Sequence, residues 1–123
     1  MRINEKGTSM EITTAIHDYL HKKLSHVEKF IQNEDSALCD VELGKTTNHH
    51  KNGDVFRAEI NLHVKGKAFR AVSEMSDLYA AIDVAKDDLV RELQSNKDKK
   101  VSSVRRGGAK MKNFVKGLFN NNK

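Results

Sequence analysis

The sequence lacks several features that would assign it to a common class of protein. Its 123 residues include one cysteine, no proline and no tryptophan, and the last two absences carry no functional conclusion. The single cysteine, Cys39, excludes a disulfide within the chain and is compatible with a reducing cytoplasm. No apolar run approaches the roughly 18 residues of a membrane span. The N-terminal stretch MRINEKGTSM has no apolar signal core, so we expect no export and a cytoplasmic location.

Motifs of catalysis are also missing, so we expect no enzyme, no cofactor and no small-molecule substrate. Gly107-Gly108 does not stand between a strand and a helix, as a phosphate-binding loop requires. Cys39 falls on the apolar side of an expected strand, and nothing nearby in the sequence would activate a thiolate. Asp83 and Asp87 lie on the outward side of an expected helix, where carboxylates stay hydrated and have no pocket.

Six histidines raise the alternative of a metal site. His17 and His21 are four residues apart on an expected helix, so both can face one ion. Their stretch, HDYLH, lacks the glutamate of a zinc-protease motif, and no third ligand is evident in the sequence. His49-His50 falls in a polar loop beside Lys51. We therefore interpret the histidines as surface residues and predict no metal site.

Charge is distributed unevenly along the chain. Residues 1–96 hold 13 Lys and Arg against 16 Asp and Glu, a net charge of −3. Residues 97–123 hold nine Lys and Arg against one Asp, a net charge of +8. A compact basic block is typical of a segment that contacts a polyanion such as nucleic acid. The alternative is a solvated tail that only aids solubility.

Two segments have the apolar period of amphipathic helices. The first runs from about Thr13 to Ile31, and either Thr13 or Thr14 can supply the capping hydroxyl. The second follows Ser76, its expected N-cap, and ends near Asn96. The stripes expected to be buried are Ile12, Ile16, Leu20, Leu24, Val27 and Ile31 in the first helix, and Leu78, Ile82, Ala85, Leu89 and Leu93 in the second.

Three further segments alternate between apolar and polar residues, which is typical of half-buried strands. Asn52-Gly53 and Gly66 favour hairpins between them. The order strand, helix, three strands, helix predicts an α+β fold, with both helices packed on one face of a four-stranded sheet and the other face open to water. The expected strands are 37–45, 55–66 and 67–74, preceded by a short first strand at Arg2–Asn4.

We expect a folded domain over residues 1–97 and a basic, mostly disordered C-terminal tail over 98–123. Many like charges and Gly107-Gly108 favour disorder in the tail. Within it, apolar residues recur between lysines over 111–119, which is a basic amphipathic pattern. This pattern is too short to form a stable helix alone in water.

Basic residues on the two expected helices form the candidate binding surface. Lys22, His26 and Lys29 share the outward side of the first helix, and Lys23 lies at its apolar edge with room to extend outward. Such groups would contact phosphates without reading bases, and structured RNA is recognised in this way. The basic groups at the end of the second helix are Lys97, Lys99 and Lys100.

The two helical segments resemble a known family. The stretch DLYAAIDVAKDDLVRELQ is similar to the second-helix signature of the bacterial ribosome hibernation-promoting factor and protein Y family. The stretch MEITTAIHDYLHKKLSHVEKF resembles the first-helix pattern of Ile-Thr, a downstream Asp-Tyr, then Lys-Leu and a closing Glu-Lys-Phe. The resemblance covers about residues 1–97. It implies a β-α-β-β-β-α domain, similar in shape to a double-stranded RNA-binding domain.

The resemblance also implies a non-enzymatic translation inhibitor of stress or stationary phase. Such a protein binds ribosomal RNA of the small ribosomal subunit, in the channel used by messenger and transfer RNA. We also expect a monomer off the ribosome and no membrane partner. The RNA-binding residues that the resemblance implies are Lys22, Lys23, Lys29, Arg91, Lys97, Lys99 and Lys100.

Two other functions stay open at this point. In the first, the domain is a carrier whose basic amphipathic tail docks on a protein or an anionic membrane, as such segments can. In the second, the domain binds any double-stranded RNA with equal affinity. Neither alternative involves catalysis.

Overall fold

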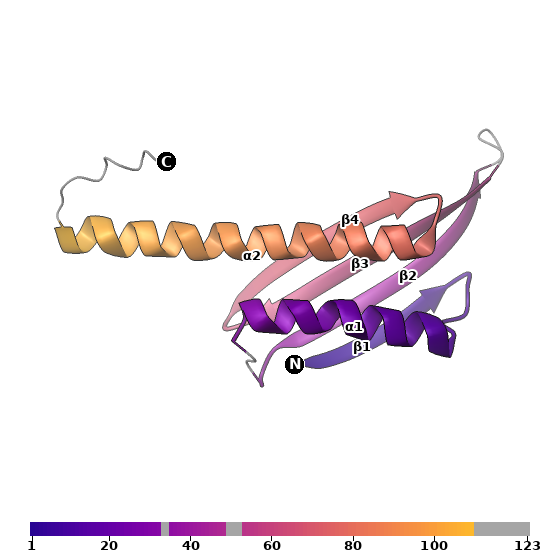
Figure 1. Ribbon diagram of the computed structural model, residues 1–123, viewed down its shortest axis with the longest axis horizontal. Helices are drawn as coiled ribbons and strands as arrows, with labels where there is room; N and C mark the ends of the chain where they lie inside the picture. Colours follow the sequence, from indigo (N-terminus) through magenta and orange to yellow (C-terminus); the bar gives the residue numbers. More distant parts are fainter. Residues whose placement is uncertain (33–34, 49–52, 110–123) are drawn as a thin grey trace. The chain divides into compact units, whose positions relative to one another are not determined.

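The computed structural model has six elements in the predicted order β-α-β-β-β-α. It describes residues 1–32, 35–48 and 53–109. The chain divides into two compact units, Met1–Arg91 and Glu92–Lys123. The strands are β1 (Arg2–Thr8), β2 (Leu38–Asn48), β3 (Gly53–Val64) and β4 (Lys67–Met75), and the helices are α1 (Thr14–Phe30) and α2 (Leu78–Ala109) (Figure 1).

The four strands form one mixed sheet in the order β1-β2-β3-β4. β1 runs parallel to β2, and the other two pairings are antiparallel. Because parallel neighbours cannot be joined by a tight turn, the chain crosses over through α1 between them. β1 is longer than the predicted Arg2–Asn4, since its pairing with β2 continues as far as Thr8 and Gly44. This extension places Glu5 within the sheet.

α1 and the first-unit part of α2, residues 78–91, cover the same face of the sheet, as predicted (Figure 1). The inward side chains of β2 lie opposite those of β3 in register, so that Cys39 faces Leu62 and Val41 faces Ile60. Burial of this apolar face is the main stabilising term of such a domain, and it raises the pKa of the Cys39 thiol to about 12. The fully buried helix residues include Leu20, Leu24, Val27, Ile82, Ala85 and Leu89, all from the predicted stripes.

The sequence located the start of α1 correctly and missed the limits of α2. The Thr13 hydroxyl accepts a hydrogen bond from the Ile16 N–H at 3.3 Å and caps α1. In α2 the cap is the carboxylate of Asp77, which accepts from the Ala80 N–H at 2.9 Å, so the assignment of Ser76 was wrong by one residue. The expected end near Asn96 was also wrong.

α2 continues to Ala109 because nothing in its sequence forbids the helix. The chain has no proline, a glycine costs a helix only about 1 kcal/mol, and basic residues near a helix C-terminus complement its dipole. The division between a domain ending at residue 97 and a tail stays a prediction. The amphipathic pattern over 111–119 lies outside the described residues. Within the described residues, neither helix has the apolar length that a membrane span needs.

The outer face of the sheet is polar, as predicted, and is organised around Glu59. The carboxylate accepts hydrogen bonds from Asn61 and Arg70 at 3.0 Å each and from Arg57 at 2.8 Å. These donors, led by Asn61, lower the pKa of Glu59 from its ordinary value of 4.5 to about 2. The charged carboxylate therefore links Arg57 and Asn61 of β3 with Arg70 of β4 on the solvent-facing side of the sheet.

We predict that Glu59→Gln makes the free energy of unfolding less sensitive to acidic pH. Because the folded-state pKa of Glu59 is lowered, its contribution is present above pH 4.5 and is lost as the pH falls toward about 2. Urea unfolding at several pH values should show wild type losing more free energy of unfolding across this window than the variant. Equal losses in the two proteins would contradict the assignment.

Candidate nucleic-acid interface

Three residues form a basic ridge along the outward side of α1. Lys22, His26 and Lys29 stand four and then three positions apart, so the 3.6-residue turn brings them onto one side of the helix. Because the buried stripe that contains Leu20 and Leu24 packs against the sheet, the opposite side of the helix faces solvent. All three ridge residues are exposed. We call this group the α1 ridge. Among the described residues, neither of its lysines forms an ion pair with a carboxylate.

Lys23, the neighbour of the ridge, is held by other side chains. Its Nζ lies 3.4 Å from Oδ1 of Asp83, and its side chain is 24% exposed. The same nitrogen lies 5.2 Å from the centre of the Tyr19 ring, a cation–π distance. Lys23 therefore reaches from α1 to α2 and is less available to an external anion than Lys22 or Lys29.

Asp83 and Tyr19 form a polar junction between the two helices. The Tyr19 hydroxyl donates a hydrogen bond to Oδ1 of Asp83 at 2.7 Å. The Tyr19 ring also meets the Tyr79 ring edge to face, with centroids 4.8 Å apart. The hydrogen bond to the carboxylate stabilises the neutral phenol and raises the pKa of Tyr19 to about 12. The sequence analysis predicted only a hydrated carboxylate at Asp83, because no local pattern reveals a contact between residues 64 positions apart.

The cations on the first-unit part of α2 have acidic neighbours. Arg91 contacts Asp88 one turn earlier on the helix, and Nζ of Lys86 lies 2.7 Å from Asp87. The exposed Arg91–Asp88 pair contributes little to stability, but both pairs neutralise charge locally. On the described helices of the first unit, the unpaired cations therefore gather on the α1 ridge.

The remaining predicted site residues belong to the second unit. Lys97, Lys99 and Lys100 have helical backbone within α2. Their side-chain contacts lie outside what the structure describes. Their assignment to an RNA-binding surface stays a prediction, as do those of Arg91 and the α1 lysines.

The fold and the α1 ridge together define a class of protein. A small α+β domain places a rigid basic helix at its surface, and such a helix can contact nucleic acid phosphates by shape and charge. The chain belongs to the family described as sigma 54 modulation protein / S30EA ribosomal protein, whose model matches residues 3–101. This membership confirms the resemblance found in the two helix motifs.

Individual relatives agree with the family match. A ribosome hibernation promoting factor from Klebsiella oxytoca is 35% identical over 99 residues, which are 80% of this chain and 96% of that protein. A ribosome hibernation promotion factor from Picosynechococcus is 31% identical over 99 residues, which are only 50% of that protein. The crystal structure of the Thermus thermophilus protein Y N-terminal domain aligns with a TM-score of 0.64 and 34% identity, covering 77% of this chain and 98% of that domain.

The polar junction between the helices can be tested by tyrosine titration. The chain has two tyrosines and no tryptophan, so Tyr79→Phe leaves Tyr19 as the only phenol. We expect Tyr19 in that variant to titrate with a pKa of about 12 in ultraviolet absorbance. Adding Asp83→Asn should bring the pKa back toward 10.0, because the charged acceptor is gone.

Circular dichroism at each pH is the control that both variants remain folded during the titration. If the two variants titrate at the same pH while folded, the Tyr19–Asp83 hydrogen bond does not exist in solution.

Proposed function

We propose that this protein is a non-enzymatic ribosome hibernation factor. It binds ribosomal RNA of the small subunit in the channel used by messenger and transfer RNA, and it silences translation in stress or stationary phase in the cytoplasm. The observation that supports this most strongly is the family match over residues 3–101. The ribosome hibernation promoting factor from Klebsiella oxytoca aligns over 96% of its length.

The α1 ridge supports the RNA part of the proposal. Lys22 and Lys29 are exposed and have no carboxylate partner among the described residues, so no ion pair must break before they contact a phosphate. Each phosphate contact releases condensed counterions, which makes binding favourable at low salt and weaker as salt rises. Lys23 can join them only by leaving Asp83.

The net charge of the domain does not reveal the contribution that the α1 ridge can make to RNA binding. Residues 1–96 have a net charge of −3, so the domain as a whole does not attract RNA over long distances. Binding must then depend on local contacts where cations are unpaired, together with the +8 segment that begins at Lys97.

Inhibition by this mechanism needs no reactive group. A rigid domain in the channel excludes messenger and transfer RNA by its volume. The one thiol, Cys39, is buried with a pKa raised to about 12, and therefore stays protonated and inert at neutral pH. The chemistry of the described residues is thus consistent with a binding protein.

We predict that reversing both ridge lysines, as Lys22→Glu with Lys29→Glu, weakens binding to small ribosomal subunits. The two substitutions remove two phosphate contacts and should reduce the slope of log affinity against log salt by about two. Co-sedimentation with purified subunits over a salt series measures this slope. The matched control is Lys6→Glu with Lys67→Glu, which makes the same charge change at two exposed lysines of β1 and β4.

Three outcomes separate the proposal from its alternatives. Loss of binding in the ridge variant alone supports it. Equal loss in the control variant would show that only net charge matters, and unchanged binding by the ridge variant would reject the ridge assignment. Competition experiments separate the two alternatives. Displacement of the subunit by arbitrary RNA duplexes would favour a general RNA-binding domain. Displacement by anionic vesicles would favour the carrier domain with a membrane-docking tail.

A further inference from the structure

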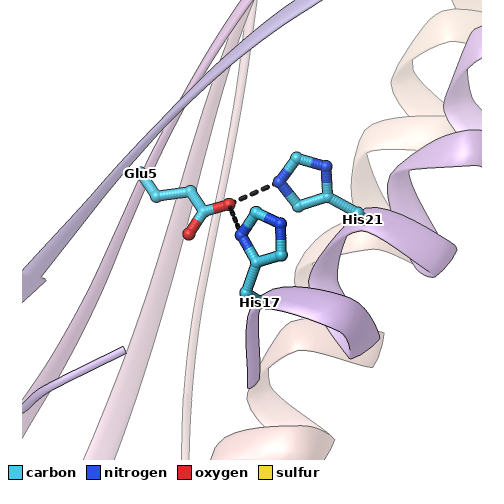
Figure 2. Close-up of side chains that lie close together, drawn as sticks. All are labelled: Glu5, His17 and His21. Carbon is cyan, nitrogen blue, oxygen red and sulfur yellow. Dashed lines mark hydrogen bonds and ion pairs between the residues drawn. The ribbon is translucent and has the colours of Figure 1, made fainter. Parts of the chain in front are cut away.

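A carboxylate and two imidazoles converge between β1 and α1, outside the α1 ridge. Nδ1 of His17 lies 2.5 Å from Oε2 of Glu5, and Nε2 of His21 contacts the same oxygen (Figure 2). One ligand atom from each residue lies within 4.8 Å of the other two. The sequence revealed the two histidines and no third ligand. Glu5 was missed because β1 is longer than its alternation showed, and its pairing with β2 brings Glu5 opposite α1.

The backbone explains why these three side chains meet. Glu5 and Ile3 are half-buried whereas Arg2, Asn4 and Lys6 are exposed, so alternation along β1 turns Glu5 toward the helix layer. His17 and His21 are one helical turn apart, and their ring centroids are 4.0 Å apart at an interplanar angle of 32°.

We propose that Glu5, His17 and His21 bind a divalent transition-metal ion, with zinc as the expected occupant. Two imidazole nitrogens and one carboxylate oxygen are the ligand set of a three-residue zinc site that leaves a fourth position to water. Imidazole nitrogen favours zinc, copper and nickel over magnesium and calcium, which prefer oxygen ligands. Metal binding at these residues does not presuppose the proposed ribosome binding.

The three side chains can move as far as metal coordination would require. Bonds of about 2.0 to 2.2 Å at tetrahedral angles place ligand atoms roughly 3.3 Å apart, so Glu5 and His17 would separate by less than about 1 Å. His17 is 48% exposed and His21 35%, which allows this small rotation, while Glu5 is 16% exposed and is held by the sheet.

An open hollow beside the cluster provides access for the ion and for water. It has a volume of about 460 Å³, and Glu5 and His17 line it together with Gly7, Met10 and Thr14. A side chain at Gly7 would clash with the following loop, since a Cβ there would lie 2.5 Å from the Met10 carbonyl oxygen. The loop after β1 can therefore pass close to the site.

A bound ion would join β1 to α1 and stabilise the folded state by mass action, because the unfolded chain does not hold the three ligands together. The joined helix is the one that carries Lys22 one residue after His21. Metal binding would thus fix the helix that carries the α1 ridge to β1.

The test is zinc titration of the full chain by calorimetry, with thermal unfolding as a second readout. Wild type should bind one zinc ion per chain and melt at a higher temperature with zinc, and magnesium should have no such effect. Glu5→Gln should weaken zinc binding by about tenfold or more, and His17→Ala with His21→Ala should abolish it. The matched control, His26→Ala with His63→Ala, removes two exposed histidines that are not in the cluster and should leave binding unchanged.

Cobalt supplies a spectroscopic check on the ligands. Its visible absorption should appear in wild type and in the control variant, and be absent from the variant without His17 and His21. Wild type that binds no zinc would overturn the proposal and leave only a hydrogen-bonded cluster. Zinc binding that persists in the double-histidine variant would also overturn it, because the ion would then be held by other residues.

Discussion

The apolar layer between the sheet and the two helices is the constraint on which the other features of the domain depend. Strand residues such as Val41 and Ile60 oppose each other in register, and the stripes of α1 and α2 cover them. Because these stripes must face the sheet, the opposite sides of the helices must face solvent. The burial of Leu20 and Leu24 therefore directs Lys22 and Lys29 outward, and the same constraint makes the outer sheet face polar.

Ion pairs within the domain then determine which cations are available to bind an external ligand. The domain is acidic on average, yet its acids are not spread evenly over its cations. Lys23 is engaged by Asp83, Arg91 by Asp88 and Arg70 by Glu59. The α1 ridge is left unpaired among the described helix residues of the first unit. The α1 ridge therefore supplies unpaired cations within residues 1–96, whose net charge is −3.

The sequence predicted those features that repeat along the chain, and it missed those that join distant residues. Periodicity was enough to find both helices, three of the four strands and most of the buried stripes, and Thr13 was recognised from its chemistry as a cap. The extent of β1 and α2 was missed because strand pairing and helix propagation are cooperative and leave little local signal. Glu5 and His17, like Tyr19 and Asp83, come together only through the topology of the sheet and the helices.

The most direct test of ribosome binding through the α1 ridge is a cryo-electron map of the protein on the small ribosomal subunit. We expect density for the domain in the messenger and transfer RNA channel, with the α1 ridge facing ribosomal RNA phosphates and the outer sheet face, around Glu59, turned away from them. A domain found outside that channel, or bound in it with the α1 ridge facing solvent, would rule out this mode of binding.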